Sequence, residues 1–434
     1  MSKYICKKPG KKSVDIIFRD RKVVSSSYNR EYSFVFKKGK GMHLWDVDGR
    51  KYLDFAASVA VNSVGHANSE VIKAVKKQMK DGFHCAFPDF YAEIPVNFIE
   101  NLLKFVPKHL NNVFLSNSGT ESNECALKLA KWHTNKKWLI ASDICFHGRS
   151  MGSLSMTNSK KVQRERFNPF LPVKHVPYPY FYRSKFEDEE DLSNHCLDAW
   201  EKSIKKLKKE LAAVFLEPIS GEGGYVVPPK SFVKGLRKAC DKYDVLLVSD
   251  EIQAGCYRTG KFLAIENYNV KADIVSLSKA IGGGIPLGVT LANKKTMDWI
   301  PGSHSTTFGG NLLACVSGMA TLNYMRKHKL GDNALKIGNY MMKRLNEMKD
   351  QYDVIGDVRG KGLMIGVEIV EDKRSKNYGI KERHSILCKA SEKGLVLLGC
   401  GNNVIRMCPP LIINKKQADY GLDLFEDAVK DIPK

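Results

Sequence analysis

The segment SLSKAIGGGIPLG, at residues 276–288, contains a lysine whose amine could do chemistry. Lys279 follows an apolar, strand-like run at residues 273–277 and precedes three consecutive glycines at 282–284. A lysine amine is a nucleophile at neutral pH only when burial or a neighbouring positive charge lowers its pKa. Most lysines are solvated surface groups, and this chain is rich in lysine. The role of Lys279 therefore depends on the residues that accompany it.

A second group of residues could bind an anion. Ser118, Gly119 and Thr120 lie between an apolar run and a segment with helical periodicity. Backbone amides and the helix dipole at such a helix N-terminus suit a phosphate group. A simple capping sequence is an equal alternative, because Ser118 or Thr120 could cap the helix and Glu121 could complete the cap. The motif alone leaves both interpretations open.

A carboxylate and an amide follow another apolar run. Asp250 ends the run DVLLVSD, and Gln253 lies three residues further on. An aspartate in this position is usually the cap of a turn. A carboxylate at the end of a buried strand can also hold a proton on a ring nitrogen of a ligand, and this is the functional alternative.

Two segments combine groups that recognise rings and carboxylates. Phe146, His147 and Arg149 follow the run WLIASD and bring an aromatic face and a guanidinium together, although Phe146 alone suggests core and Arg149 alone suggests surface. Arg406 stands on a short apolar run before two prolines. A bidentate arginine is a natural receptor for a carboxylate, but an isolated one is more often part of a structural ion pair.

Two further segments complete the set. Glu217 and Glu222 flank a glycine-rich turn, and Thr306 and Thr307 precede a Gly-Gly pair. Each signal is weak alone. Together they supply an amine, a phosphate site, an aromatic face, a partner for a ring nitrogen and receptors for carboxylates, which is the set that pyridoxal phosphate requires.

The composition excludes some classes of protein. The formal net charge of the 434 residues is +22, yet the positive residues are spread along the chain, which argues against the alternative of a nucleic-acid-binding protein. No apolar run approaches the ~18 residues of a membrane span. The eleven cysteines form no C-x-x-C pair and no zinc-like spacing. We expect a soluble cytoplasmic protein with reduced thiols, with no metal site, no membrane and no nucleic-acid partner.

The middle of the chain alternates apolar runs with helical patterns. The runs at 111–119, 137–143, 211–218, 243–251 and 272–279 are interpreted as buried strands. Such alternation predicts an α/β fold with a mainly parallel sheet covered by helices.

The two ends of the chain differ from the middle in their pattern. Residues 41–55 are typical of a hairpin with Asp48-Gly49 at its turn, and residues 357–370 suggest further strands. The predicted domains are an N-terminal segment, 1–85, a large domain, 86–330, and a C-terminal segment, 331–434, the two ends forming a small α+β domain together. The acidic segment 184–194 is expected to be a surface loop.

The motifs, taken in order, resemble a known family. From about residue 15 to residue 425 the chain is similar to the fold-type I, class III aminotransferases, which depend on pyridoxal phosphate. The motifs that carry this resemblance are SNSGTES, FHGRSMGSLS, EPISGEGG, DEIQAGCYRTGK, SKAIGGGIPLG, STTFGGN and IRMCPPL. The implied fold has a large domain with a seven-stranded type of sheet.

The resemblance implies roles around the cofactor. Lys279 would carry pyridoxal phosphate covalently and later move a proton, and Asp250 would keep the pyridine nitrogen protonated. Gln253 would donate to the ring oxygen. The other residues expected at the cofactor are Ser118, Gly119 and Thr120 at the phosphate, Phe146 stacked on the ring, His147, and Thr307, which would reach the phosphate of the neighbouring subunit in a homodimer with shared active sites or in a higher oligomer.

Roles toward the substrate are also implied. Arg149 would bind a substrate carboxylate, and Arg406 would bind the carboxylate nearer the reacting carbon. Glu222 would pair with Arg406 when the amino donor has no such group, and Thr306 is expected to contact substrate. The position of Ser220 usually holds glutamine in the family, which puts in doubt how Glu222 is held.

Within the family, the resemblance is strongest to 4-aminobutyrate and ornithine aminotransferases of archaeal type. It implies transfer of an amino group from such an ω-amino donor to a 2-oxo acid, 2-oxoglutarate, giving glutamate. Two alternatives stay open: a broad-specificity amino-acid racemase, which uses the same deprotonation, and an acetylornithine aminotransferase.

Overall fold

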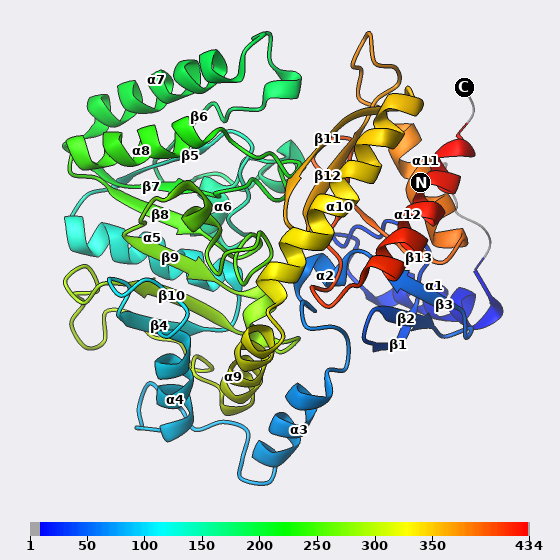
Figure 1. Cartoon of the computed structure of the whole chain (residues 1–434). Helices are drawn as coiled ribbons and strands as arrows, with labels where there is room; N and C mark the ends of the chain where they lie inside the picture. Colours follow the sequence, from blue (N-terminus) through cyan, green and yellow to red (C-terminus); the bar gives the residue numbers. More distant parts are fainter. Residues whose placement is uncertain (1–8, 433–434) are drawn as a thin grey trace. The chain divides into compact units, whose positions relative to one another are not determined.

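The computed structural model describes residues 9–432, which form two compact units (Figure 1). Unit 1 contains the described parts of Met1–Asn68 and Asp332–Lys434, and unit 2 is Ser69–Gly331. Residues 69–85, grouped with the N-terminal segment in the sequence-based division, lie in unit 2. The reason is that helix α3 (Ser69–Gln78) packs against helix α9 (Leu312–Lys327), with Lys327 Nζ 2.8 Å from Glu70 Oε1.

A seven-stranded sheet forms the centre of unit 2, in the order β4-β10-β9-β8-β7-β5-β6. The strands are β4 (Asn112–Ser116), β5 (Trp138–Ser142), β6 (Val173–Val176), β7 (Leu211–Leu216), β8 (Leu246–Asp250), β9 (Ile274–Leu277) and β10 (Gly288–Ala292). Neighbouring strands are parallel except that β10 runs antiparallel to both β4 and β9. The predicted mainly parallel sheet is confirmed, and each of the five predicted runs contains a strand.

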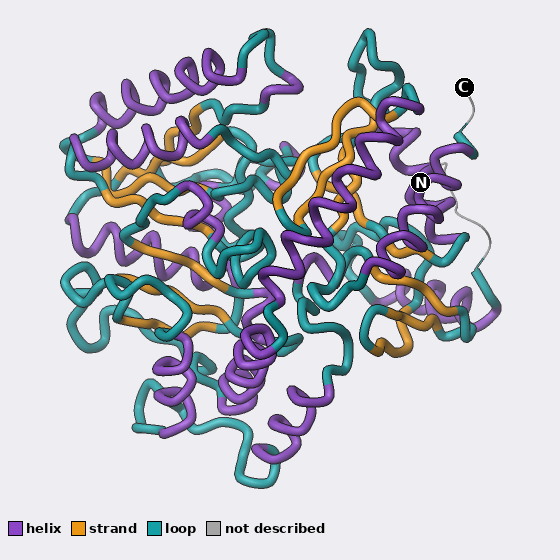
Figure 2. Tube along the Cα trace, in the orientation of Figure 1, coloured by secondary structure: helices purple, strands orange, loops and turns teal. Residues whose placement is uncertain are grey.

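Helices lie along these strands (Figure 2). Helix α5 (Gly119–Thr134) packs on β4, β7, β8, β9 and β10, while α7 (Glu189–Leu207) and α8 (Lys230–Lys242) pack on each other and on β5, β6 and β8. All residues of β7 and β10 are buried. Continuous apolar runs are the pattern expected when a sheet is covered on both faces. Unit 2 also contains α4 (Glu93–Leu102), α6 (Met151–Met156), η1 (Lys161–Gln163), η2 (Phe181–Arg183), η3 (Ala264–Tyr268) and η4 (Lys279–Gly282).

The acidic segment 184–194 is only partly a loop, and this expectation was wrong for its second half. Helix α7 begins at Glu189, and the Asp188 side chain caps it by accepting from the backbone amides of Glu190 and Asp191. Three acidic residues in the first turn suit the positive end of the helix dipole. Leu192 is buried, so this end of the helix belongs to the packed structure.

Unit 1 contains two four-stranded sheets, β1-β2-β3-β13 and β11-β12-β15-β14. The predicted hairpin is formed by β2 and β3, and Gly49 has the positive φ of 90° that its turn requires. The strands are β1 (Phe36–Lys40), β2 (His43–Asp46), β3 (Lys51–Asp54), β11 (Ile355–Lys361), β12 (Met364–Ile369), β13 (Leu395–Val396), β14 (Leu398–Cys400) and β15 (Val404–Met407). The helices are α1 (Lys11–Val23), α2 (Ala57–Ala60), α10 (Leu330–Gln351, whose first two residues are in unit 2), α11 (Ile380–Glu392) and α12 (Lys415–Lys430).

The turn assigned to α2 is left-handed. All four residues, 57–60, have φ between 44° and 64°, a region that costs an L-residue roughly 1–2 kcal/mol. The buried carboxylate of Asp54 stabilises the entry to this turn. Its Oδ1 accepts from the backbone amides of Ala56 and Ala57, and its Oδ2 lies 2.6 Å from His66 Nε2.

No helix among the described residues is both long and apolar enough to cross a membrane.

We predict that Asp54→Ala destabilises unit 1 by about 3 kcal/mol, because it leaves two buried amides and a buried histidine without their acceptor. The free energy of unfolding is measured in urea, with the unfolding of unit 1 monitored by hydrogen exchange of the amides in residues 36–66. The control is Asp353→Ala, in the same unit, whose side chain is 91% exposed. Equal stability of the two variants would contradict the prediction.

Candidate active site

The carboxyl ends of five strands meet at one edge of the unit 2 sheet. Strands β4, β5, β7, β8 and β9 run in the same direction, so the residues that follow them come together, as is usual for ligand sites in α/β sheets. A cavity of about 300 Å³ lies there. It is lined by Ser118, Gly119, Thr120, Phe146, His147, Gly148, Arg149, Glu217, Asp250, Ile252, Gln253 and Lys279.

Lys279 lies in a loop that is closed at both ends. The lysine follows β9 and has a φ of 47°, an unfavourable value that needs support from its surroundings. The Ser278 hydroxyl donates to the carbonyl of Leu287 at 2.8 Å, just before β10, and the Ser317 hydroxyl donates to the carbonyl of Gly282 at 2.7 Å. These bonds fix the backbone at Lys279, and the lysine is one of the residues that line the cavity.

Asp250 is held in a buried hydrogen-bond network. Its Oδ2 accepts from His147 Nδ1 at 2.8 Å and from Asn123 Nδ2 at 2.7 Å, and its Oδ1 accepts from the backbone amide of Ile252. Burial acts to lower the pKa of His147, but Cys145 and the hydrogen bond to Asp250 outweigh it and hold that pKa well above its usual value. His147 thus acts as a hydrogen-bond donor to Asp250.

The N-terminus of α5 opens onto the same cavity. Ser118 is the helix cap and its hydroxyl accepts from the backbone amide of Glu121, as the capping interpretation predicted. The Thr120 hydroxyl lies 2.7 Å from that of Ser150 and 2.6 Å from that of Ser153. Capping and anion binding are compatible here, because the first turn of the helix also lines the cavity.

A buried glutamate connects two loops of the site. Glu217 Oε2 accepts from the backbone amide of Phe146 at 2.9 Å, and its Oε1 accepts from that of Gly221 at 3.0 Å. Burial raises the pKa of Glu217 to about 7. The Arg149 guanidinium carbon lies 5.7 Å from the centre of the Phe146 ring, which places this exposed cation beside the aromatic face.

Gln253 is oriented by a tyrosine. The Tyr225 hydroxyl donates to Gln253 Oε1 at 2.8 Å, which leaves the amide nitrogen to act as a donor. Tyr225 is fully buried and has a φ of 54°. A Cβ added to Gly221 would lie 2.4 Å from Gln253 Nε2, so the glycine-rich turn packs directly on this amide.

Four predicted substrate or subunit residues do not line the cavity. Glu222 pairs with Lys160, and the Thr306 hydroxyl accepts from Asn117 Nδ2 at 3.2 Å. Thr307 is exposed. Arg406 lies in unit 1 on β15, where its Nε and Nη2 donate to the carbonyl of Gly399.

Sequence reasoning left several residues of the site without a role. Glu217 was noticed but given no function, and Asn123, Ile252 and Tyr225 were not identified. Asn123 could have been found as an amide on a helix face that otherwise carries small or apolar residues. For Tyr225 we see no sequence signal, because its role depends on a bend of the chain.

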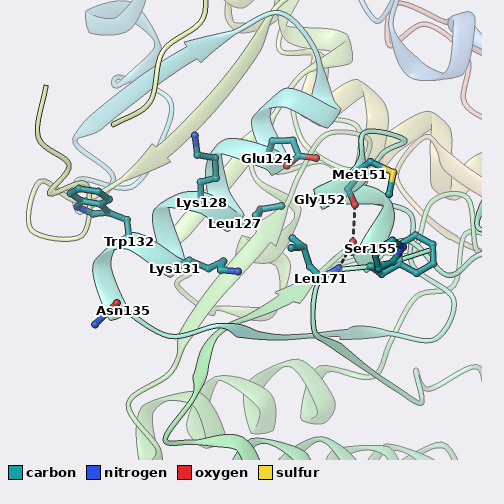
Figure 3. A pocket seen from close by; sticks show the side chains of 12 residues that line it. Glu124, Leu127, Lys128, Lys131, Trp132, Asn135, Met151, Gly152, Ser155 and Leu171 are labelled. Carbon is teal, nitrogen blue, oxygen red and sulfur yellow. Dashed lines mark hydrogen bonds between the residues drawn. The ribbon is translucent and has the colours of Figure 1, made fainter. Parts of the chain in front are cut away.

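A larger and more open hollow, of about 890 Å³, lies between α5, α6 and residues 169–171 (Figure 3). In it the Ser155 hydroxyl bridges the carbonyl of Met151 and the backbone amide of Leu171. Its lining includes Lys128 and Lys131 but none of the predicted site residues. The smaller cavity is therefore the candidate active site, because the lysine, the buried carboxylate and the helix N-terminus meet there.

The cavity fits pyridoxal phosphate. Asp250 can accept a hydrogen bond from a protonated ring nitrogen, the start of α5 can bind the phosphate, Phe146 and Ile252 offer apolar surface, and Lys279 supplies an amine. The chemistry of this set corresponds to the cofactor group by group.

Comparison with known proteins agrees with this site. The family Aminotransferase class-III matches residues 24–429. The alanine/serine racemase of Pyrococcus horikoshii is 36% identical, covering 99% of this chain and 93% of its own. The acetylornithine aminotransferase of Methanopyrus kandleri is 37% identical, covering 93% of this chain and 96% of its own.

A solved structure has the same fold. The ornithine aminotransferase of Toxoplasma gondii superimposes with a TM-score of 0.86 at 28% identity, covering 98% of this chain and 96% of that one. The match of the family to nearly the whole chain, together with the site above, leads to one conclusion. This chain belongs to the class III aminotransferase family and is a fold-type I, pyridoxal-phosphate-dependent enzyme.

Proposed function

We propose that the enzyme transfers an amino group from an ω-amino donor, of the 4-aminobutyrate or ornithine class, to 2-oxoglutarate and so forms glutamate. The observation that carries this proposal is the meeting of Lys279, Asp250 and the N-terminus of α5 around one cavity. When bound, pyridoxal phosphate supplies an electron sink for the carbon that loses its proton. The remaining steps depend on the residues of this chain.

Lys279 is the base in this proposal. Its amine would anchor the cofactor covalently, and as a free amine it would remove a proton from the donor carbon that carries the amino group. Asp250 would hold a proton on the ring nitrogen, and the hydrogen bonds from His147 and Asn123 orient its carboxyl group for this role. Gln253, oriented by Tyr225, donates to the ring oxygen.

Binding of the two ends of the cofactor completes the site. Ser118, Gly119 and Thr120 would hold the phosphate at the positive end of α5, and Phe146 would offer its aromatic face to the ring. Glu217 keeps Phe146 in place by accepting a hydrogen bond from the Phe146 backbone amide.

Substrate carboxylates are assigned to arginines. Arg149, beside the Phe146 ring, binds one carboxylate, and Arg406 binds the carboxylate on the reacting carbon. Thr306 and Glu222 are proposed to contact substrate, and pairing of Glu222 with Arg406 stays a prediction.

We propose a cytoplasmic homodimer in which the exposed Thr307 reaches the phosphate in the neighbouring subunit.

A second candidate function is racemisation of amino acids. The racemases of Pyrococcus horikoshii and Thermococcus litoralis are 36% and 35% identical to this chain, and their names give alanine, serine, leucine and methionine as substrates. Acetylornithine aminotransferases are equally similar, so N-acetylornithine is a further donor to test. Racemisation needs the same base and the same ring-nitrogen partner, and differs in where the proton returns.

The donor is tested by incubating the holoenzyme with 4-aminobutyrate, ornithine, N-acetylornithine or a single enantiomer of alanine or leucine, with and without 2-oxoglutarate. We expect glutamate from an ω-amino donor only when 2-oxoglutarate is present. Loss of optical purity without any oxo acid would instead identify a racemase.

We predict that Lys279→Ala lowers turnover by at least about a thousandfold, because it removes both the base and the covalent anchor of the cofactor. Borohydride trapping followed by peptide mapping should locate the cofactor on residue 279 in the parent and find no label there in the variant. The matched control, Lys261→Ala, removes an exposed lysine and should keep the label and the rate. A trapped label on another lysine of the parent would contradict the assignment.

We predict that Glu217 makes the cofactor-free protein less stable as pH rises. Its pKa of about 7 exceeds the ordinary 4.5, so between these values the folded state keeps a proton that the unfolded state has lost. The free energy of unfolding should fall by up to about 3 kcal/mol across this window and level off above it.

The Glu217 prediction is tested by the pH dependence of urea unfolding. Glu217→Gln should flatten the slope, and part of it should remain because burial also raises the pKa of Glu251 to about 7. Glu210→Gln, at a half-exposed glutamate paired with Lys137, is the control and should leave the slope unchanged. An unchanged slope in Glu217→Gln would show that this carboxyl does not titrate in the window.

A further inference from the structure

A cluster of three hydroxyl groups lies at the end of the cavity proposed for the phosphate. Thr120 Oγ1 is 2.7 Å from Ser150 Oγ and 2.6 Å from Ser153 Oγ, and the two serine oxygens are 2.9 Å apart. Gly148 has a φ of 140°, and a Cβ added there would collide with the Thr120 and Ser153 side chains. The glycine in the loop after β5 therefore leaves room for the cluster.

Glu124 is the acceptor at one end of this cluster. It lies one helical turn after Thr120 on α5, and its Oε1 accepts from the Ser150 hydroxyl at 2.5 Å and from the Ser153 backbone amide at 2.7 Å. A Cβ added to Gly152 would collide with the Glu124 carboxylate. Both residues also line the larger hollow (Figure 3). All of these residues belong to unit 2.

Glu124 caps helix α6 in place of the usual residue. Ser150 is the N-cap of α6, yet its side chain makes no capping hydrogen bond. A cap of this kind usually satisfies the amide of the second or third helical residue, and the third residue here, Ser153, donates to Glu124 instead. Because the Ser150 hydroxyl donates to the same oxygen, one carboxylate fixes both the start of α6 and the serine that precedes it.

The proton of the Thr120 hydroxyl is left for another acceptor. A hydroxyl has one proton and two lone pairs. Thr120 Oγ1 accepts from the backbone amides of Arg149 and Ser150, each at 3.3 Å, which occupies both lone pairs. The Ser150 proton goes to Glu124, and the Ser153 hydroxyl has the carbonyl of Ser150 as an acceptor at 3.2 Å. Thr120 is therefore the donor of the cluster, and it also lines the cavity.

We propose that Glu124 is a positioning residue for the phosphate of the cofactor. By fixing Ser150 and the start of α6, it holds two backbone amides on the Thr120 oxygen, so that the Thr120 proton is directed to a phosphate oxygen. This inference rests on the proposed function, in which Thr120 binds the phosphate. The charge of a carboxylate would by itself oppose the binding of an anion, so the contribution of Glu124 lies in the direction of hydrogen bonds.

Pyridoxal phosphate and pyridoxal form a matched pair of probes. They share the ring and the aldehyde and differ in the phosphate, so the ratio of their dissociation constants isolates the recognition of that group. The holoenzyme is stripped of its cofactor, and reloading with each compound is followed through the absorbance of the bound ring. Phosphorus NMR of the reloaded holoenzyme reports separately on hydrogen bonds to the phosphate.

We expect Glu124→Leu to raise the Kd of pyridoxal phosphate about tenfold and to leave that of pyridoxal unchanged, because one hydrogen bond to a charged group is lost. Thr120→Val should cause a similar loss and a similar change of the phosphorus resonance. The double variant should bind no more weakly than Thr120→Val alone, because both changes act on the same hydrogen bond. Glu124→Gln keeps an oxygen that can accept from Ser150 and should retain most of the affinity.

Two further variants complete the test. Glu187→Leu, at an exposed glutamate of the same unit, is the control and should leave both dissociation constants unchanged. Ser150→Ala is a smaller truncation that removes one of the two donors to Glu124, and it should weaken the binding of pyridoxal phosphate alone. If Glu124→Leu does not fold, an unchanged ratio in Ser150→Ala is enough to overturn the inference.

The outcomes separate this inference from the proposed function. An equal loss of affinity for both compounds in Glu124→Leu would overturn the inference, because Glu124 would then support only the fold. Tighter binding of pyridoxal phosphate in both Glu124 variants would also overturn it, by showing that charge dominates. In either case, a loss in Thr120→Val would leave the proposed phosphate site standing. An unchanged ratio in Thr120→Val would contradict that site and the inference together.

Discussion

The charge of one buried carboxylate constrains the whole site. Asp250 is 4% exposed at the end of a buried strand, and an isolated charge in such a place is very unfavourable. His147 and Asn123 resolve this by donating to the same oxygen, and the Ile252 amide donates to the other. These donors come from the loop after β5, from α5 and from the residues after β8. The hydrogen bonds to Asp250 therefore require all three elements to be in register.

Much of this arrangement could be predicted from the sequence, because the chemistry is local to each strand end. Lys279, Asp250 and Gly119 each follow an apolar run, and the parallel direction of those runs is enough to bring them to one edge of the sheet. Short motifs of this kind need no information on side-chain packing. The same reasoning explains why nine predicted residues line one cavity.

The rest could not be predicted, because it depends on contacts between segments that are distant in the chain. The connection from Glu217 to Phe146 spans 71 residues, and that from Lys160 to Glu222 spans 62. The left-handed turn at 57–60 contains no glycine, the residue that usually indicates a positive φ in a sequence. The first turn of α7 was missed because a run of acidic residues resembles a solvated loop, although Asp188 and the helix dipole favour a helix there.

The loop that carries Lys279 also reverses the direction of the chain. Since β10 is antiparallel to β9, the residues between them leave the sheet and return to it as the neighbouring strand. The bond from Ser278 to Leu287 closes the loop at its base, and Ser317 ties its far side to α9. In the proposed mechanism, the making and breaking of the covalent bond at the lysine nitrogen would be accommodated by rotation about the single bonds of that side chain. The backbone of the loop would keep its position while only the lysine side chain rotates.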